Sequence, residues 1–179
     1  MTTPQDLLII AMEVPFRRDV GQGDLSLALA GAEAVDLADA RALPLDGDRM
    51  VPGAPWTTDD GLLSRAASSL VREEPYETVE DWLWRRGRDL YEAYRVAAEA
   101  GAPAARERAR ERWSHGDPVL VGLAASVGIE HPGGAAAAPG GGPVGTVLGA
   151  VHDAETELEA VRQRRAIENA AFDNIWRTP

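Results

Sequence analysis

The fold class is decided by two adjacent stretches, GDLSLALAGAEAVDL at residues 23–37 and ALPLDGDRMV at residues 42–51. In the first stretch, apolar residues recur at mostly helical spacing after Asp24, a residue type that favours the N-cap of a helix. In the second, apolar segments flank an Asp-Gly dipeptide, which is a strong short-range signal for a β-hairpin turn. The sequence therefore predicts a capped apolar helix that leads into a tight hairpin.

Helical patterns also follow one another along the rest of the chain. Thr3 and Thr78 each begin a helix-start signal, with a carboxylate three residues later. Residues 132–143 are rich in glycine, alanine and proline, a composition typical of a mobile loop. Helices are predicted at about 4–13, 25–37, 61–72, 79–86, 89–100, 104–114, 118–127 and 144–173. We expect one mainly α domain over residues 1–179, folded as a compact helical bundle with a short β-hairpin near residues 42–51.

The chain is acidic and contains no cysteine. Its 29 acidic and 18 basic residues give a net charge of −11, and all the basic residues are arginine. This charge argues against nucleic acid as a partner, because neutralisation of phosphates supplies most of that affinity. The lack of cysteine excludes disulfides and thiolate metal sites, which fits a cytoplasmic protein. No apolar run is long enough for a membrane span, and no basic segment of a signal peptide precedes Leu7.

Several patterns suggest a cofactor, metal or nucleic-acid site, but another explanation fits each of them better. Gly21-Gln22-Gly23 superficially resembles a dinucleotide fingerprint, but a predicted helix stands where that motif needs a strand. His152, Glu155 and Glu159 share a helix face, but no second set accompanies them, so a solvated acidic face is favoured over a metal site. Residues 24–51 lack the cations of a nucleic-acid-binding winged helix. No catalytic residue, metal or cofactor is assigned, and we expect the protein not to be an enzyme.

The candidate binding residues are cations and an indole around the predicted helix at 79–86, with a weaker pair in the loop before residue 20. They are Trp82, Arg85, Arg86 and Arg88, with Arg17 and Arg18 as the weaker pair. Guanidinium groups hold phosphates through paired hydrogen bonds, and tryptophan suits a membrane interface, so the cluster could bind an anionic lipid headgroup. In the alternative interpretation, Trp82 lies in the core and the arginines pair with the abundant acids.

The order of these motifs resembles the Golgi phosphoprotein 3 family, in particular its bacterial members. The resemblance rests on the two stretches quoted first and on LLII at 7–10, ETVEDW at 77–82, RARERW at 108–113, and VRQRR with AFDNIW within 161–176. It implies a mainly helical, non-enzymatic adaptor that docks peripherally on membranes. Eukaryotic members bind phosphatidylinositol 4-phosphate and short cytoplasmic tails of glycosyltransferases. The expected partners are therefore an anionic, phosphoinositide-like headgroup or membrane surface, and cytoplasmic tails of membrane proteins.

The chain departs from the family pattern at two places. The family's lipid pocket has a tryptophan and an arginine at positions that align with Gly21 and Ala30, and of two further arginines only one is matched, by Arg88. In addition, the hydrophobic β-hairpin that family members carry after the helix ending at Gly101 is missing from this sequence. The alternative function is therefore a soluble protein-interaction module that kept the fold and lost the lipid site.

Overall fold

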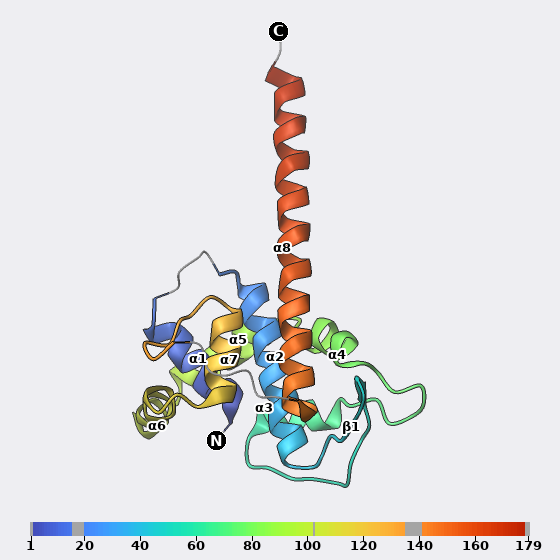
Figure 1. The fold of residues 1–179 in the computed structure, drawn as a ribbon, viewed down its shortest axis with the longest axis vertical. Coiled ribbons are helices and arrows are strands. Elements are labelled where there is room, and N and C mark those ends of the chain that lie inside the picture. Colours follow the sequence, from blue (N-terminus) through green and yellow to red (C-terminus); the bar gives the residue numbers. More distant parts are fainter. Residues whose placement is uncertain (1, 16–19, 102, 135–140, 178–179) are drawn as a thin grey trace.

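The computed structural model describes residues 2–15, 20–101, 103–134 and 141–177, with the side chains of the last helix described as far as Ala170. Over these residues the protein is mainly helical, as predicted, with eight helices and one two-stranded antiparallel sheet. The elements are α1 (Thr3–Glu13), α2 (Gln22–Asp39), β1 (Leu45–Asp46), β2 (Arg49–Met50), α3 (Gly61–Ser68), α4 (Val79–Arg86), α5 (Leu90–Glu99), α6 (Pro103–Ser114), α7 (Pro118–Ser126) and α8 (Gly142–Arg177). Figure 1 shows the shorter helices gathered around α2, with α8 extending beyond them.

The central element of the bundle is α2. Thirteen of its 18 residues are buried, because α1, α4, α5, α7 and α8 all pack against it. A helix that is covered on all sides must carry small or apolar side chains all round, which accounts for its run of alanine and leucine. Gly31 allows α8 to come close, since a Cβ at this position would lie only 2.4 Å from Cγ2 of Val151. The packing of α2 against α8 therefore depends on a residue without a side chain.

The start of α2 differs from the prediction. The sequence favours Asp24 as the N-cap, but the helix begins at Gln22 with Gly21 as the N-cap. Asp24 is the third helical residue, and its carboxylate accepts the N–H of Gly21 at 2.8 Å. The guanidinium of Arg162 on α8 binds the same carboxylate at 2.7 Å. Asp24 thus satisfies a free backbone donor of the first turn from inside the helix, and it also joins α2 to α8.

The predicted hairpin is present, although its strands are shorter than the apolar pattern. The strands pair antiparallel in the register Leu45–Met50 and Asp46–Arg49. Gly47 in the turn has a φ of 62°, a conformation that glycine adopts without strain. The N–H of Val79 donates to the carbonyl oxygen of Asp48 at 2.9 Å. The hairpin is therefore hydrogen-bonded to the start of α4, far from it in sequence.

Other helix bounds differ by a few residues. The third helix was expected to reach about residue 72, but α3 ends at Ser68, and the Ser69 hydroxyl then donates to the Ala66 carbonyl oxygen at 2.9 Å. This bond satisfies a carbonyl group at the helix end. The last helix is longer than predicted, since α8 continues to Arg177. Residues 135–140 of the predicted mobile loop lie outside the described residues.

The arginine-rich helix α6 has partners that its sequence does not indicate. Alternating arginine and glutamate predict ion pairs along one solvated face. In the structure, Arg108 and Arg112 bind the buried carboxylate of Asp6 on α1, at 3.0 and 2.7 Å, and Arg110 binds Glu13 at 2.7 Å. The helix is thus joined to α1 by charge. Only three residues separate the end of α5 from the start of α6, too few for a hairpin at this point.

We expect Gly31→Val to lower the free energy of unfolding by about 1–3 kcal/mol, because its side chain would overlap Val151 and force α2 and α8 apart. Urea denaturation followed by circular dichroism measures the change. The control is Gly149→Val on α8, where an added Cβ has no neighbour within 4 Å and the expected change is within about 0.5 kcal/mol. Equal losses in the two variants would contradict the close packing at Gly31.

Candidate functional site

The predicted cationic cluster lies on α4 and just after it. Thr78 caps this helix, as predicted, with its hydroxyl oxygen accepting the N–H of Asp81 at 3.0 Å. Gly87 ends the helix and donates its N–H to the carbonyl oxygen of Leu83 at 2.9 Å. A Cβ at Gly87 would lie 3.3 Å from the backbone oxygen of Ser26 on α2. Both ends of α4 are therefore fixed, and its last turn lies against the central helix.

Trp82 points into the core. Its side chain has no solvent exposure, and its indole N–H donates to the carbonyl oxygen of Ala30 on α2 at 3.1 Å. Ala30 is also fully buried, so its methyl group lies in the core. A buried indole with its N–H satisfied stabilises the packing of α4 on α2.

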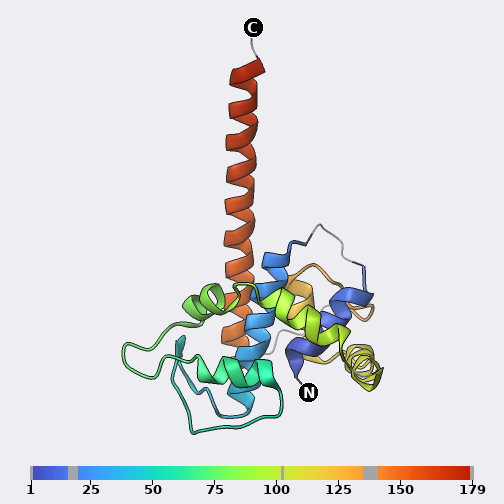
Figure 2. The ribbon, with the colours of Figure 1, turned by 180° about the vertical axis from the view of Figure 1, so that it is seen from behind.

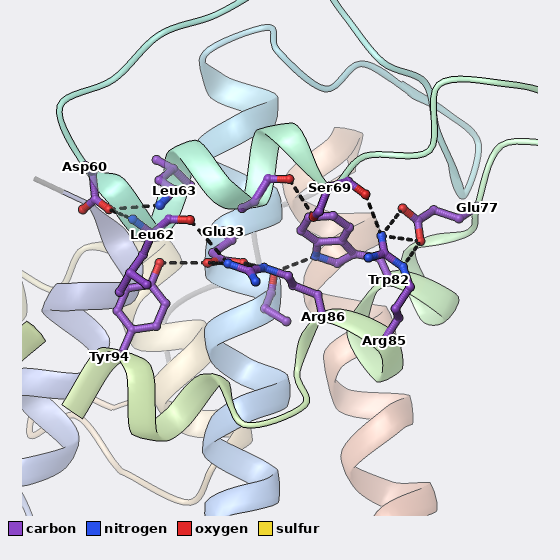
Figure 3. Close-up of polar contacts among 12 residues, drawn as sticks. Glu33, Asp60, Leu62, Leu63, Ser69, Glu77, Trp82, Arg85, Arg86 and Tyr94 are labelled. Carbon is purple, nitrogen blue, oxygen red and sulfur yellow. Dashed lines mark hydrogen bonds and ion pairs between the residues drawn. The ribbon is translucent and has the colours of Figure 1, made fainter. Parts of the chain in front are cut away.

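Arg86 is the partner of a buried carboxylate. Its guanidinium binds both oxygens of Glu33 on α2, at 2.7 Å from Nε and 2.9 Å from Nη2 (Figure 3). Glu33 has no solvent exposure, and the hydroxyl of Tyr94 on α5 donates to it at 2.9 Å. Burial raises the pKa of Glu33, while the hydrogen bonds and charge of Arg86 oppose the shift. Burial and this carboxylate raise the pKa of Tyr94 as well, so its hydroxyl remains a donor.

Arg85 is bound to a second carboxylate. Its guanidinium contacts Glu77 at 2.6 Å and also donates to the carbonyl oxygen of Ser69 at 3.1 Å, as Figure 3 shows. Its guanidinium carbon lies 5.3 Å from the centre of the Trp82 ring, within the range of a cation–π contact. The Arg85 side chain is 44% exposed, but the Glu77 side chain is only 8% exposed. Arg85 therefore attaches α4 to the segment that joins it to α3.

Arg88, the third cation of the predicted cluster, does not join this network among the described residues. Arg88 is exposed, and among the described residues it has no hydrogen-bond or ion-pair partner. Arg17 and Arg18 lie outside the described residues. The structure thus pairs Arg85 and Arg86 with the buried carboxylates of Glu77 and Glu33, and it leaves Arg88 facing solvent.

The residues weighed as a metal site lie along α8. His152, Glu155 and Glu159 line a shallow pocket with Ser126 of α7, whose hydroxyl donates to Glu155 at 3.0 Å. In the part of the chain that the structure describes, no group of three or more histidine, cysteine, aspartate or glutamate side chains is placed to hold a metal ion. Nor does any helix there combine the length and apolarity needed to cross a bilayer.

A second charged surface lies where the hairpin turn, the start of α4 and the first half of α8 meet. We call it the acidic groove and define it by Asp48, Glu80, Asp153 and Glu157. Most of its remaining lining is small, namely Gly145, Thr146, Gly149, Ala150 and Ala154. Its volume is about 360 Å³, and all four carboxylates are exposed without an ion-pair partner among the described residues. The acidic groove combines uncompensated negative charge with a floor that a peptide backbone can approach closely.

Sequence reasoning missed the acidic groove. The available signal was on α8, where Gly149, Asp153 and Glu157 follow one another at four-residue steps and therefore share a helix face. Asp48 and Glu80 come from the hairpin turn and the first turn of α4, and only the folded chain brings them beside α8. A charge pattern divided among three elements is not visible in any one segment.

Comparison with known proteins agrees with the resemblance seen in the sequence. A family model described as Golgi phosphoprotein 3 (GPP34) matches residues 4–100, more than half of the chain. The match takes in the helices from α1 to α5 and the hairpin, whereas the motifs at 108–113 and within 161–176 lie beyond it. No curated protein and no solved structure matches the chain significantly.

We expect Arg86→Met to lower the free energy of unfolding by about 3–5 kcal/mol at neutral pH, because it leaves the Glu33 carboxylate buried without its cation. The loss should shrink as the pH falls. Without Arg86, the folded-state pKa of Glu33 rises further above its value in the unfolded chain, so protonation favours the folded state. The stability that the variant loses as the pH rises through the folded-state pKa of Glu33 is therefore regained below the pKa that Glu33 has in the unfolded chain. Urea denaturation between neutral and acidic pH measures this trend.

The matched control is Arg88→Met, the same substitution two residues further along the chain. Because Arg88 is exposed and has no partner among the described residues, its replacement should leave the unfolding free energy unchanged at each pH. A loss in Arg86→Met that stays constant with pH would contradict the dependence of buried Glu33 on this cation.

Proposed function

Because the chain belongs to the Golgi phosphoprotein 3 family, we propose that it is a non-enzymatic adaptor at the cytoplasmic face of a membrane, whose acidic groove binds a basic segment of a protein partner. The distribution of charge is the observation that carries this proposal. Arg85 and Arg86, the cations suited to a lipid phosphate, are bound to Glu77 and Glu33. The acidic groove, in contrast, keeps four exposed carboxylates.

Cytoplasmic tails of membrane proteins are the partner class that fits this charge. Segments next to the cytoplasmic ends of membrane spans carry an excess of lysine and arginine. A net charge of −11 attracts such segments, and complementary charge accelerates their association. The same net charge opposes direct adsorption to an anionic leaflet. Recognition of a basic tail would therefore bring the protein to the membrane without strong lipid binding.

The double variant Asp153→Arg/Glu157→Arg tests the acidic groove. It should weaken binding of a fluorescein-labelled nonapeptide of alternating arginine and leucine by about tenfold or more, because two of the four groove charges are reversed. Fluorescence anisotropy at about 0.15 M salt measures the dissociation constant under conditions that screen long-range attraction.

The control for this experiment is Glu107→Arg/Glu111→Arg on α6. These two residues are exposed, have the same four-residue spacing and produce the same change in net charge. They lie on an element that contributes nothing to the groove lining. We expect this variant to bind the peptide with nearly the affinity of the parent protein. If both double variants lose affinity equally, net charge alone attracts the peptide and the proposal for the groove fails.

Recognition of an anionic lipid headgroup is the second candidate function, and Arg88 favours it. This residue follows α4, is exposed, and has no partner among the described residues. Arg17 and Arg18 are further candidates for headgroup binding, and only the sequence supports them, because they lie outside the described residues. Arg85 and Arg86 cannot test headgroup binding, because their replacement removes internal ion pairs and would confuse lost structure with lost affinity.

Liposome sedimentation tests the lipid hypothesis. Headgroup recognition predicts more bound protein with vesicles containing phosphatidylinositol 4-phosphate than with phosphatidylserine vesicles of equal charge, and Arg88→Ala should remove this difference. The control is Arg65→Ala at an exposed position on α3, which should retain it. Equal binding to both kinds of vesicle would reject headgroup recognition and leave the proposal for protein binding in place.

A further inference from the structure

The acidic groove is long and narrow. The lining that α8 contributes to it runs from Gly145 to Glu157, which is about 18 Å at a rise of 1.5 Å per residue. A volume of about 360 Å³ over this length corresponds to a cross-section of about 20 Å² and a width of about 4–5 Å. Neighbouring β-strands lie about 4.8 Å apart, whereas an α-helix with its side chains is about 10–12 Å wide. The groove therefore accommodates an extended chain but is too narrow for a helix.

The four carboxylates of the groove come from two walls. Asp153 and Glu157 belong to α8 and are about 6 Å apart along the helix axis. Asp48 and Glu80 belong to the hairpin turn and the first turn of α4. The carbonyl oxygen of Asp48 accepts the N–H of Val79 at 2.9 Å, which holds this second pair together. Both ribbon views show α4 and the hairpin on the same side of α8, beside its first half (Figures 1 and 2). A partner that neutralises both walls must therefore direct cations to two sides.

The floor of the groove is open at Gly149. This residue is exposed, and a Cβ added to it would meet no atom within 4 Å. Gly145 lies about one helical turn before it and Ala150 directly after it, so a peptide backbone can lie close against this part of α8. A larger side chain at position 149 would occupy the space of such a backbone without disturbing the packing of α8.

Given the basic partner proposed above, on which this inference rests, we propose that the groove binds about five residues of an extended chain, with basic side chains at three or more successive positions. Successive side chains of an extended chain point to opposite sides, and every second one returns to the same side after about 6.6 Å. This repeat is close to the separation of about 6 Å between Asp153 and Glu157. The first and third basic residues would therefore contact α8. The second would contact Asp48 or Glu80 on the other wall.

Two fluorescein-labelled nonapeptides of the same composition test the proposal. Each contains three arginines among glycine and serine, at three successive central positions in one peptide and at the first, fifth and ninth positions in the other. Their equal net charge gives them the same long-range attraction to the protein. Fluorescence anisotropy at about 0.15 M salt should give a dissociation constant about tenfold lower for the successive arginines. Gly149→Val should raise that constant about tenfold or more, because the valine side chain occupies the floor.

The matched control is Gly61→Val on α3, where an added Cβ also meets no atom within 4 Å and which lies outside the groove lining. It should bind both peptides with the affinity of the parent protein, and circular dichroism checks that both variants keep their helix content. Equal affinity for the two peptides, no binding of either, or unchanged affinity in Gly149→Val would overturn the extended basic segment. The proposed function is judged separately, by the effect of Asp153→Arg/Glu157→Arg on the alternating arginine–leucine peptide.

Discussion

The ion pair between Glu33 and Arg86 is the contact on which the architecture depends. α2 is the central helix, and it carries a carboxylate with no exposure to water. An unpaired charge at such a place would cost several kcal/mol, so a cation must reach it from another element. Arg86 does so from α4, while Tyr94 of α5 supplies a further hydrogen bond. Because the buried carboxylate of Glu33 needs these partners, it fixes the positions of α4 and α5 against α2.

The same requirement shapes the outer surface. Several arginines are bound to carboxylates: Arg86 to Glu33, Arg85 to Glu77, Arg162 to Asp24, and Arg108 and Arg112 to Asp6. In each case the carboxylate is the more buried partner. The four carboxylates of the acidic groove, in contrast, have no ion-pair partner among the residues that the structure describes. A scaffold held by internal arginines suits recognition of basic segments better than recognition of phosphates.

The parts of this structure that sequence predicts are those set by neighbours in the chain. The helices, the Asp-Gly turn and the Thr78 cap each depend on residues a few positions apart. The partner of Arg86 is 53 positions away, and Glu33 stands among alanines in a stretch that gives no sign of how its charge is met. For the same reason, the partners of α6 and the acidic groove became visible only in the fold. Local pattern specifies the elements, while burial decides which charges must pair.

The continuity of α8 links the acidic groove to a part of the molecule that lies outside the bundle. One unbroken helix contributes Gly149, Asp153 and Glu157 to the acidic groove and continues to Arg177. At 1.5 Å per residue, the helix extends about 30 Å beyond the groove. A basic tail bound in the groove would therefore lie at a fixed distance from the far end of the same helix.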